Sequence, residues 1–184
     1  ETINKLVAIE GNLHEIYYNT LLLISTNENL TLKKREIRPP KNELNALISF
    51  GNSLVYVEIL SEIYKTHLDP RIGYLHTTNY RRFSLNLDVA EIFKPIIADR
   101  IIFKVINKGM IKKKHFEEKT GGIYLNEKGR KKFLKKYDEM LAQTIKVRHI
   151  SNKVSYRRLL RLELYKIEKH IIGEKKYEPY VSRW

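Results

Sequence analysis

The sequence predicts an all-α fold, a single multi-helix domain over residues 1–184 with a short loop or hairpin near 110–125. Three observations predict it. Five or six long segments repeat apolar residues near every 3.6 positions, strand patterns are few, and no internal repeat is visible. The chain has 184 residues, of which 42% are hydrophobic, so it can bury a core of ordinary domain size.

The first helix is expected from Thr2 to Ser25, where apolar residues recur at helical spacing. Residues 26–41 are polar and basic and end in Pro39-Pro40, which is typical of a loop. Asn42 then has the chemistry of an N-cap, and a second helix is expected to continue to about His67.

The next helix is expected after Ser84, a second candidate N-cap, and it carries few purely polar positions. Pro95 is expected to kink this helix or to start a new turn, because proline removes a helical hydrogen bond. Apolar periodicity then resumes and stops at Lys108-Gly109.

The last third of the chain begins with a charged, turn-like stretch from Met110 to Tyr124, with Thr120-Gly121-Gly122 as a hairpin or loop tip. Asn126 is expected to cap a helix over residues 127–147. A final helix is expected over residues 156–172, with Gly173 as its stop.

The charge of the chain favours a polyanionic partner. Lysine and arginine total 35 against 21 acids, a formal net charge of +14. The absence of cysteine excludes disulfides, zinc ribbons and thiol catalysis. No apolar run is long enough to span a bilayer, so we expect a cytoplasmic protein without a membrane partner. The start at Glu1, without methionine, is interpreted as a cut from a longer chain.

The stretch from Leu68 to Pro95 holds the residues that indicate chemistry. Asp88 and Glu91 are three apart in a mostly apolar helix, so their carboxylates share one face. Carboxylates on such a helix need to be paired, protonated or bound to a metal. His76 lies on a loop after an Asp-Pro turn. With Glu10 it completes a candidate metal site, in which an imidazole tilts the preference from Mg²⁺ towards Mn²⁺.

Two alternatives remain open from the residues alone. The two acids could simply pair with Arg81, Arg82 or Arg100. On the first helix, Glu10 and its neighbours His14 and Glu15 form a rival ligand set, although a surface or capping role for His14 is the more ordinary interpretation.

Basic residues suggest where DNA could bind. Arg157 and Arg158 lie at the start of the last helix, and Arg81 and Arg82 precede the acidic helix. The segment from Met110 to Met140 resembles the wing and following helix of winged-helix proteins, so a non-catalytic DNA-binding module is the alternative function.

Several strings, in order, resemble the CRISPR-associated integrase of spacer acquisition, and the resemblance covers essentially the whole chain. They are IEGNLHEIYYN, RPPKNELNALISFGNSLVY, LDPRIGYLH, RRFSLNLDVAEIFKPIIADRI and VSYRRLLRLELYKI. The β-rich N-terminal domain of that family is missing from this sequence.

The resemblance implies a helical catalytic domain that holds a divalent metal, Mn²⁺ or Mg²⁺. The family's EG motif falls on Glu10-Gly11, its G-x-x-H string ends at His76, and its D-x-x-[DE] string places the third ligand at Glu91. Asp88 takes the first acidic position and is expected to support the site. The family alignment gives His14 no role.

The same resemblance implies metal-dependent cutting and joining of double-stranded or branched DNA by phosphodiester transesterification. Family members work as homodimers, usually bridged by a small second CRISPR-associated adaptation protein. Because much of the dimer contact involves the missing domain, we expect this fragment to be weak or inactive by itself.

Overall fold

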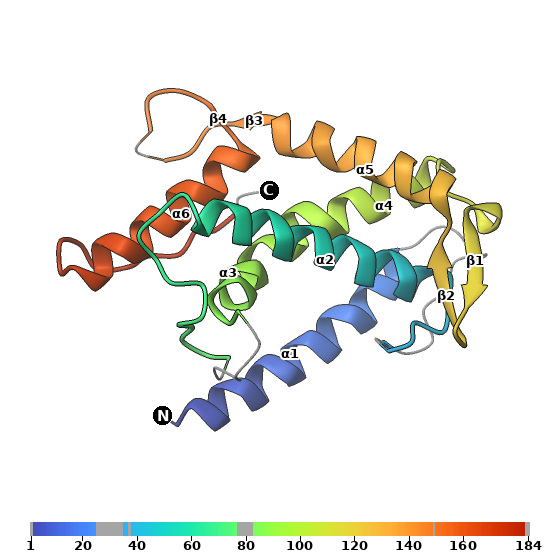
Figure 1. The fold of residues 1–184 in the computed structure, drawn as a ribbon, viewed down its shortest axis with the longest axis horizontal. Coiled ribbons are helices and arrows are strands. Elements are labelled where there is room, and N and C mark those ends of the chain that lie inside the picture. The colour runs from blue at the N-terminus through green and yellow to red at the C-terminus, as the bar shows by residue number, and fades with distance from the viewer. Residues whose placement is uncertain (1, 25–34, 37, 77–82, 149, 183–184) are drawn as a thin grey trace. The chain divides into compact units, whose positions relative to one another are not determined.

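The computed structural model describes residues 2–24, 35–36, 38–76, 83–148 and 150–182 (Figure 1). The chain divides into two compact units, one of residues 1–51 and 99–135 and the other of residues 52–98 and 136–184. Helices dominate both, as the sequence predicts. The single domain over 1–184 stays a prediction.

The described residues of the first unit form four α-helical segments and a hairpin. Its helices are α1 (Ile3–Ile24), the first half of α2 (Glu43–Ile63) and α4 (Arg100–Asn107), and the start of α5 (Glu127–Ala142) completes it. Apolar residues of α2, α4 and α5 form its buried core, and the ring of Phe50 meets that of Phe133 edge to face at 5.4 Å between centroids. Core members include Leu47, Ile48, Ile101, Ile102, Val105 and Phe133.

The predicted hairpin is present. After a 3₁₀ turn at Lys113–His115, strands β1 (Phe116–Lys119) and β2 (Gly122–Leu125) pair antiparallel, with Phe116 opposite Leu125. The two-residue connection is Thr120-Gly121, and both residues have positive φ, at 50° and 69°. This geometry suits a tight hairpin, in which glycine carries the left-handed conformation without strain.

The second unit is built from the later half of α2, α3 (Leu85–Phe93), the end of α5 and α6 (Tyr156–Ile171), with the chain after α6 running back beside it (Figure 1). Two short strands, β3 (Thr144–Ile145) and β4 (Val154–Ser155), pair between α5 and α6. Its fully buried side chains include Val55, Ile59, Ile63, Leu85, Val89, Phe93, Leu160 and Leu164.

The interruption predicted at Pro95 is confirmed. The α-helical pattern of α3 ends at Phe93, and a π-helical segment covers Lys94–Asp99 before α4 begins. A π-type turn accommodates an extra residue and a missing donor inside a helix, and such turns are frequent at functional sites.

Two predicted caps are found, and a third cap, at Ser155, was not predicted from the sequence. Asn42 accepts a bond from the Asn45 amide at 2.8 Å, and Asn126 accepts one from the Gly129 amide at 2.9 Å. Ser155 caps α6 through the Arg158 amide at 3.2 Å.

Other expectations about helix ends were wrong. Ser84 directly precedes α3, but its side chain makes no cap bond and instead donates to the carbonyl of Arg71 at 2.7 Å. α2 ends at Ile63 rather than near residue 67. α5 ends at Ala142 rather than at 147, because the next residues pair as a strand.

Among the described residues, α2 is the helix whose length and composition would allow it to cross a membrane. Half of the relevant window is buried within the protein, and Asn52 and Glu62 on this helix are buried polar residues. A core helix passes the same test, and we interpret α2 as one.

Candidate metal centre

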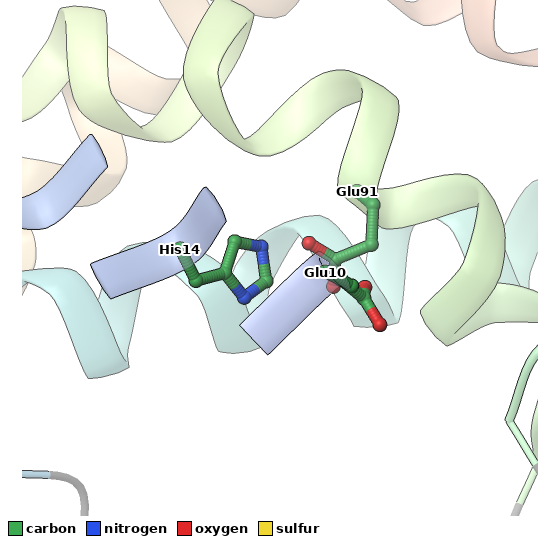
Figure 2. Close-up of side chains that lie close together, drawn as sticks. All are labelled: Glu10, His14 and Glu91. Carbon is green, nitrogen blue, oxygen red and sulfur yellow. The ribbon is translucent and has the colours of Figure 1, made fainter. Parts of the chain in front are cut away.

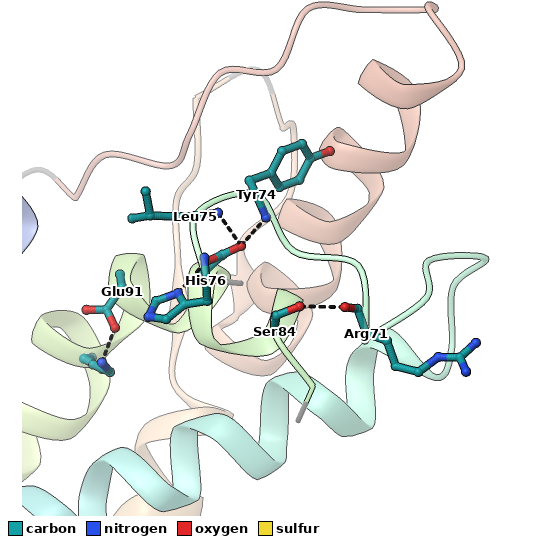
Figure 3. A network of polar contacts seen from close by, with 8 residues as sticks. Arg71, Tyr74, Leu75, His76, Ser84 and Glu91 are labelled. Atoms are coloured by element: carbon teal, nitrogen blue, oxygen red, sulfur yellow. Dashed lines mark hydrogen bonds and ion pairs between the residues drawn. The ribbon is translucent and has the colours of Figure 1, made fainter. Parts of the chain in front are cut away.

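Asp88 is the organising side chain of the loop that carries His76. Its Oδ2 accepts the backbone amides of Tyr74 at 2.5 Å and Leu75 at 3.2 Å, and its Oδ1 accepts the amide of His76 at 3.1 Å (Figure 3). Three successive amides therefore converge on one carboxylate. Such charge-assisted bonds are stronger than neutral ones, so they fix the loop on the first turn of α3.

The same carboxylate orients the imidazole. Nδ1 of His76 lies 2.5 Å from Oδ1 of Asp88. A carboxylate accepts this bond, so in the neutral imidazole Nδ1 carries the proton and Nε2 keeps a lone pair. This pattern, a carboxylate behind one ring nitrogen with the other left to bind, is typical of metal-ligating histidines.

Gly73 makes this close approach possible. A β-carbon at position 73 would lie 2.7 Å from Oδ2 of Asp88 and 2.9 Å from Cβ of Ser84. Neither neighbour can move easily, since Asp88 holds three amides and Ser84 bonds to Arg71. The glycine of the G-x-x-H string is thus explained by local packing.

Glu91 contacts Lys94, one helical turn further along, and the ammonium of Lys94 lies 5.0 Å from the centre of the Tyr56 ring. Burial lowers the pKa of Lys94, but the Glu91 carboxylate and the Tyr56 hydroxyl outweigh burial, so the pKa is raised overall. Lys94 therefore stays charged and balances Glu91. Lys94 was not predicted at the site, although the i, i+3 spacing of Glu91 and Lys94 indicates such a pair.

Glu10 lies on α1 in the first unit and is half-buried. One turn further, His14 offers a ring nitrogen within 4.8 Å of a Glu10 carboxylate oxygen. Figure 2 shows both side chains on α1, and it also draws Glu91 of α3, which belongs to the second unit. The rival pair predicted from the sequence thus exists within the first unit.

The side of α1 that carries Glu10, His14 and Tyr17 is less exposed than the side that carries its apolar residues. The hydroxyl of Tyr17, one turn after His14, donates to Oδ2 of Asp99 at 2.6 Å. Burial, and then the Asp99 charge, raise the pKa of this hydroxyl. Apolar residues that we expected on a core-facing stripe are 42–64% exposed: Leu6, Ile9, Leu13 and Ile16.

The candidate DNA-binding arginines differ in their surroundings. Arg81 and Arg82 lie outside the described residues. Arg157 forms an ion pair with Glu58 at 2.8 Å, and Arg158 is exposed on the same turn of α6. A phosphate contact by Arg157 would therefore have to compete with a carboxylate, whereas no ion pair to Arg158 is found within the described part of the chain.

In this helical fold a carboxylate anchors a histidine, and a second acid lies one turn further along α3. Oxygen and imidazole donors of this kind are those that divalent metals accept in proteins. The chain belongs to the Cas1 family: the model for CRISPR associated protein Cas1 matches residues 1–139.

Relatives support this assignment. A CRISPR-associated endonuclease Cas1 of Thermodesulfovibrio yellowstonii is 58% identical over 183 residues, which are 100% of this chain and 56% of that protein. The corresponding protein of Thermotoga maritima is 50% identical over 172 residues, 94% of this chain and 54% of the relative. The chain thus spans little more than half the length of these relatives.

Solved structures agree on the fold. The Cas1 protein of Thermotoga maritima superposes with a TM-score of 0.90 at 48% identity, over 98% of this chain and 56% of that one. A casposase bound to its integration product matches with a TM-score of 0.87 at 19% identity, over 98% and 55%, which supports the fold alone.

Proposed function

We propose that this chain is the catalytic part of a metal-dependent DNA endonuclease and integrase that acts in CRISPR spacer acquisition. Membership of the Cas1 family, with relatives named as endonucleases, gives the class of activity. The observation that carries the site is the bond between Asp88 and Nδ1 of His76, which leaves Nε2 to a metal.

The proposed ligands are Glu10, His76 and Glu91, with Asp88 as the residue that positions His76. Two carboxylates and one imidazole suit Mn²⁺ and Mg²⁺, and the imidazole favours Mn²⁺ of the two. Glu91 already forms an ion pair with the ammonium of Lys94, so a cation lies against this carboxylate in the structure.

In the proposed reaction a 3′-hydroxyl attacks a phosphodiester, a new phosphodiester forms, and the displaced strand leaves with a free 3′-hydroxyl. A bound divalent ion would supply Lewis-acid activation of the attacking oxygen and charge stabilisation at the phosphate. The carboxylates hold that ion, and Lys94, buried beside Glu91, adds positive charge. The basic surface of the protein would hold the strands and make binding depend on salt.

The partners follow from the family. We expect double-stranded or branched DNA as substrate, a homodimer, and a small second CRISPR-associated adaptation protein, all in the cytoplasm. A winged-helix module stays a weaker candidate, because the family match already includes the hairpin and most of α5. Such a module would bind phosphate through basic residues that include Lys131 and Lys132 of α5. Both have partners within the protein: Lys131 pairs with Glu127, and Lys132 donates to the Met110 carbonyl.

The test is strand transfer and cleavage of a labelled branched DNA by the intact protein with Mn²⁺. Glu10→Gln, His76→Ala and Glu91→Gln should each abolish both reactions without loss of folding, whereas Glu15→Gln, an exposed acid on the same helix, should act like the parent. His14→Ala should also retain activity. If His14→Ala is inactive and His76→Ala is active, the ligand set proposed here is wrong.

A further inference from the structure

Residues 174–182 run back along the second unit after the turn at Gly173, and we call them the C-terminal strap (Figure 1). They have no regular secondary structure, and their proline and charges give them no helical pattern. The amides of Glu174 and Lys175 donate to the Lys169 carbonyl at the end of α6. Beyond these bonds, side-chain contacts with α6 and α3 hold the strap.

The strap is held by a buried acid. Glu163 of α6 is fully buried, and its Oε1 accepts both the Tyr177 hydroxyl at 2.7 Å and the Tyr180 amide at 2.9 Å. Its other oxygen lies 2.7 Å from the ammonium of Lys166, which also donates to the carbonyl of Glu178 at 2.9 Å. A buried carboxylate is costly unless it is paired and hydrogen-bonded. Both hydrogen bonds to Glu163 come from the strap, so α6 and the strap depend on each other.

From this anchor the strap reaches α3. The ring of Tyr180 stacks on that of Phe93, with planes 5° apart and centroids at 6.2 Å. Phe93 is fully buried and follows Glu91 by two residues. Two residues correspond to about 200° around a helix, so Tyr180 supports α3 on the side opposite Glu91.

The strap also lies near the loop that carries His76. Burial, then the bond to Glu163, raise the pKa of the Tyr177 hydroxyl, and Tyr74 adds to this rise. Tyr74 is the residue whose amide donates to Asp88 at 2.5 Å. The strap therefore contacts the helix with the two acids through Tyr180, and its Tyr177 lies within electrostatic range of Tyr74 in the loop with the histidine.

We propose that the C-terminal strap is a positioning element of the metal centre: Glu163 fixes Tyr180, and the Tyr180 ring fixes the orientation of α3 and hence of Glu91. This proposal rests on the metal-binding function proposed above. It assigns a role in activity to Glu163 and Tyr180, which follow Glu91 by 72 and 89 positions along the chain. Neither residue is proposed as a ligand of the metal or a contact of DNA.

The test compares Tyr180→Leu, which removes the flat ring but keeps the amide, with Tyr180→Phe, which keeps the ring. Tyr177→Phe is a milder variant that removes one donor to Glu163. The matched control is Tyr165→Phe, which removes a hydroxyl from α6 that makes none of these contacts. All are made in the intact protein and checked for an unchanged far-ultraviolet spectrum.

Three readouts are measured: manganese affinity by titration, kcat and KM for branched DNA, and amide hydrogen exchange of residues 85–93. Tyr180→Leu should bind manganese about 10-fold more weakly, as expected when the support of a ligand is lost. Its kcat should fall with KM for DNA unchanged, and exchange in α3 should accelerate. Tyr177→Phe should show the same changes to a smaller extent, and Tyr180→Phe should behave as the parent does.

The proposal is overturned if Tyr180→Leu leaves exchange in α3 and manganese affinity unchanged, or if Tyr180→Phe is as impaired as Tyr180→Leu. Exchange in α3 needs neither metal nor DNA. If the parent binds no manganese, the proposed function fails, and unchanged exchange in Tyr180→Leu would separately overturn the positioning role.

Discussion

Replacing Asp88 with asparagine removes the charge that holds the His76 loop. The carboxylate receives four donors, namely the amides of Tyr74, Leu75 and His76 and the Nδ1–H of His76. The carbonyl oxygen of asparagine can accept about two of these four hydrogen bonds. The NH₂ group cannot accept, so the remaining donors lose their partner. With about 1–2 kcal/mol for each lost bond at this half-buried site, the free energy of unfolding should fall by about 2–4 kcal/mol.

The effect on metal binding should be separate and measurable. Once the bond to Nδ1 is lost, the ring of His76 can rotate and change tautomer, so Nε2 no longer points in one direction. Loss of such a partner typically weakens metal affinity by about 10–100-fold. Urea unfolding in the presence of a chelator measures the loss in free energy of unfolding. Titration of the folded variant with Mn²⁺ measures the loss in metal affinity.

Asp69→Asn is the matched control, because it makes the same chemical change in the same loop. Asp69 pairs with Arg71 at the surface, and the bonds from Arg71 hold the pKa of Asp69 down to about 2. Its replacement should leave manganese affinity unchanged. Equal manganese affinities in Asp88→Asn and the parent would refute the role assigned to Asp88.

Three further changes test other parts of the structure. Gly73→Ala should weaken manganese binding by about 10-fold or more in titration, since its β-carbon would displace Asp88; affinity equal to the parent would contradict the packing. Lys94→Met should strengthen manganese binding several-fold in the same titration, because a cation beside Glu91 is removed, and weaker binding would show that Lys94 supports the ion. Burial, then Lys132 and Lys114, lower the pKa of His115, so its stabilising contribution is complete above the unfolded pKa of about 6.5 and is lost as pH falls towards the folded value. In His115→Gln, the free energy of unfolding measured in urea should therefore decline less steeply from pH 7 to pH 5. An unchanged slope would contradict this contribution of His115.

Local signals in the sequence predicted the parts of the fold that depend on local chemistry. Asn42 and Asn126 cap the helices that follow them, because each needs only the backbone of its own first turn. The hairpin tip at Gly121 follows likewise from the conformations that glycine allows. The family motifs named Glu10, His76 and Glu91, whose role as one ligand set stays a prediction.

Long-range pairings could not be predicted. Ser84 had the residue type of a cap, but the carbonyl of Arg71 competes for its hydroxyl. Arg157 was expected to meet phosphate, yet Glu58, 99 positions away, pairs with it. Glu163 has an ordinary helical position in the sequence, and its role depends on a strap that returns after the helix ends. Each case depends on which distant segment folds nearby, which local periodicity does not encode.

The most direct test of the central claim is a crystal structure of the intact protein soaked with Mn²⁺, with the ion located by its anomalous scattering. The account predicts one ion bound by carboxylate oxygens of Glu10 and Glu91 and by Nε2 of His76, while Nδ1 of His76 keeps its bond to Asp88. An ion bound by Glu10 and His14 with His76 turned away, or no ordered ion at these acids, would contradict it.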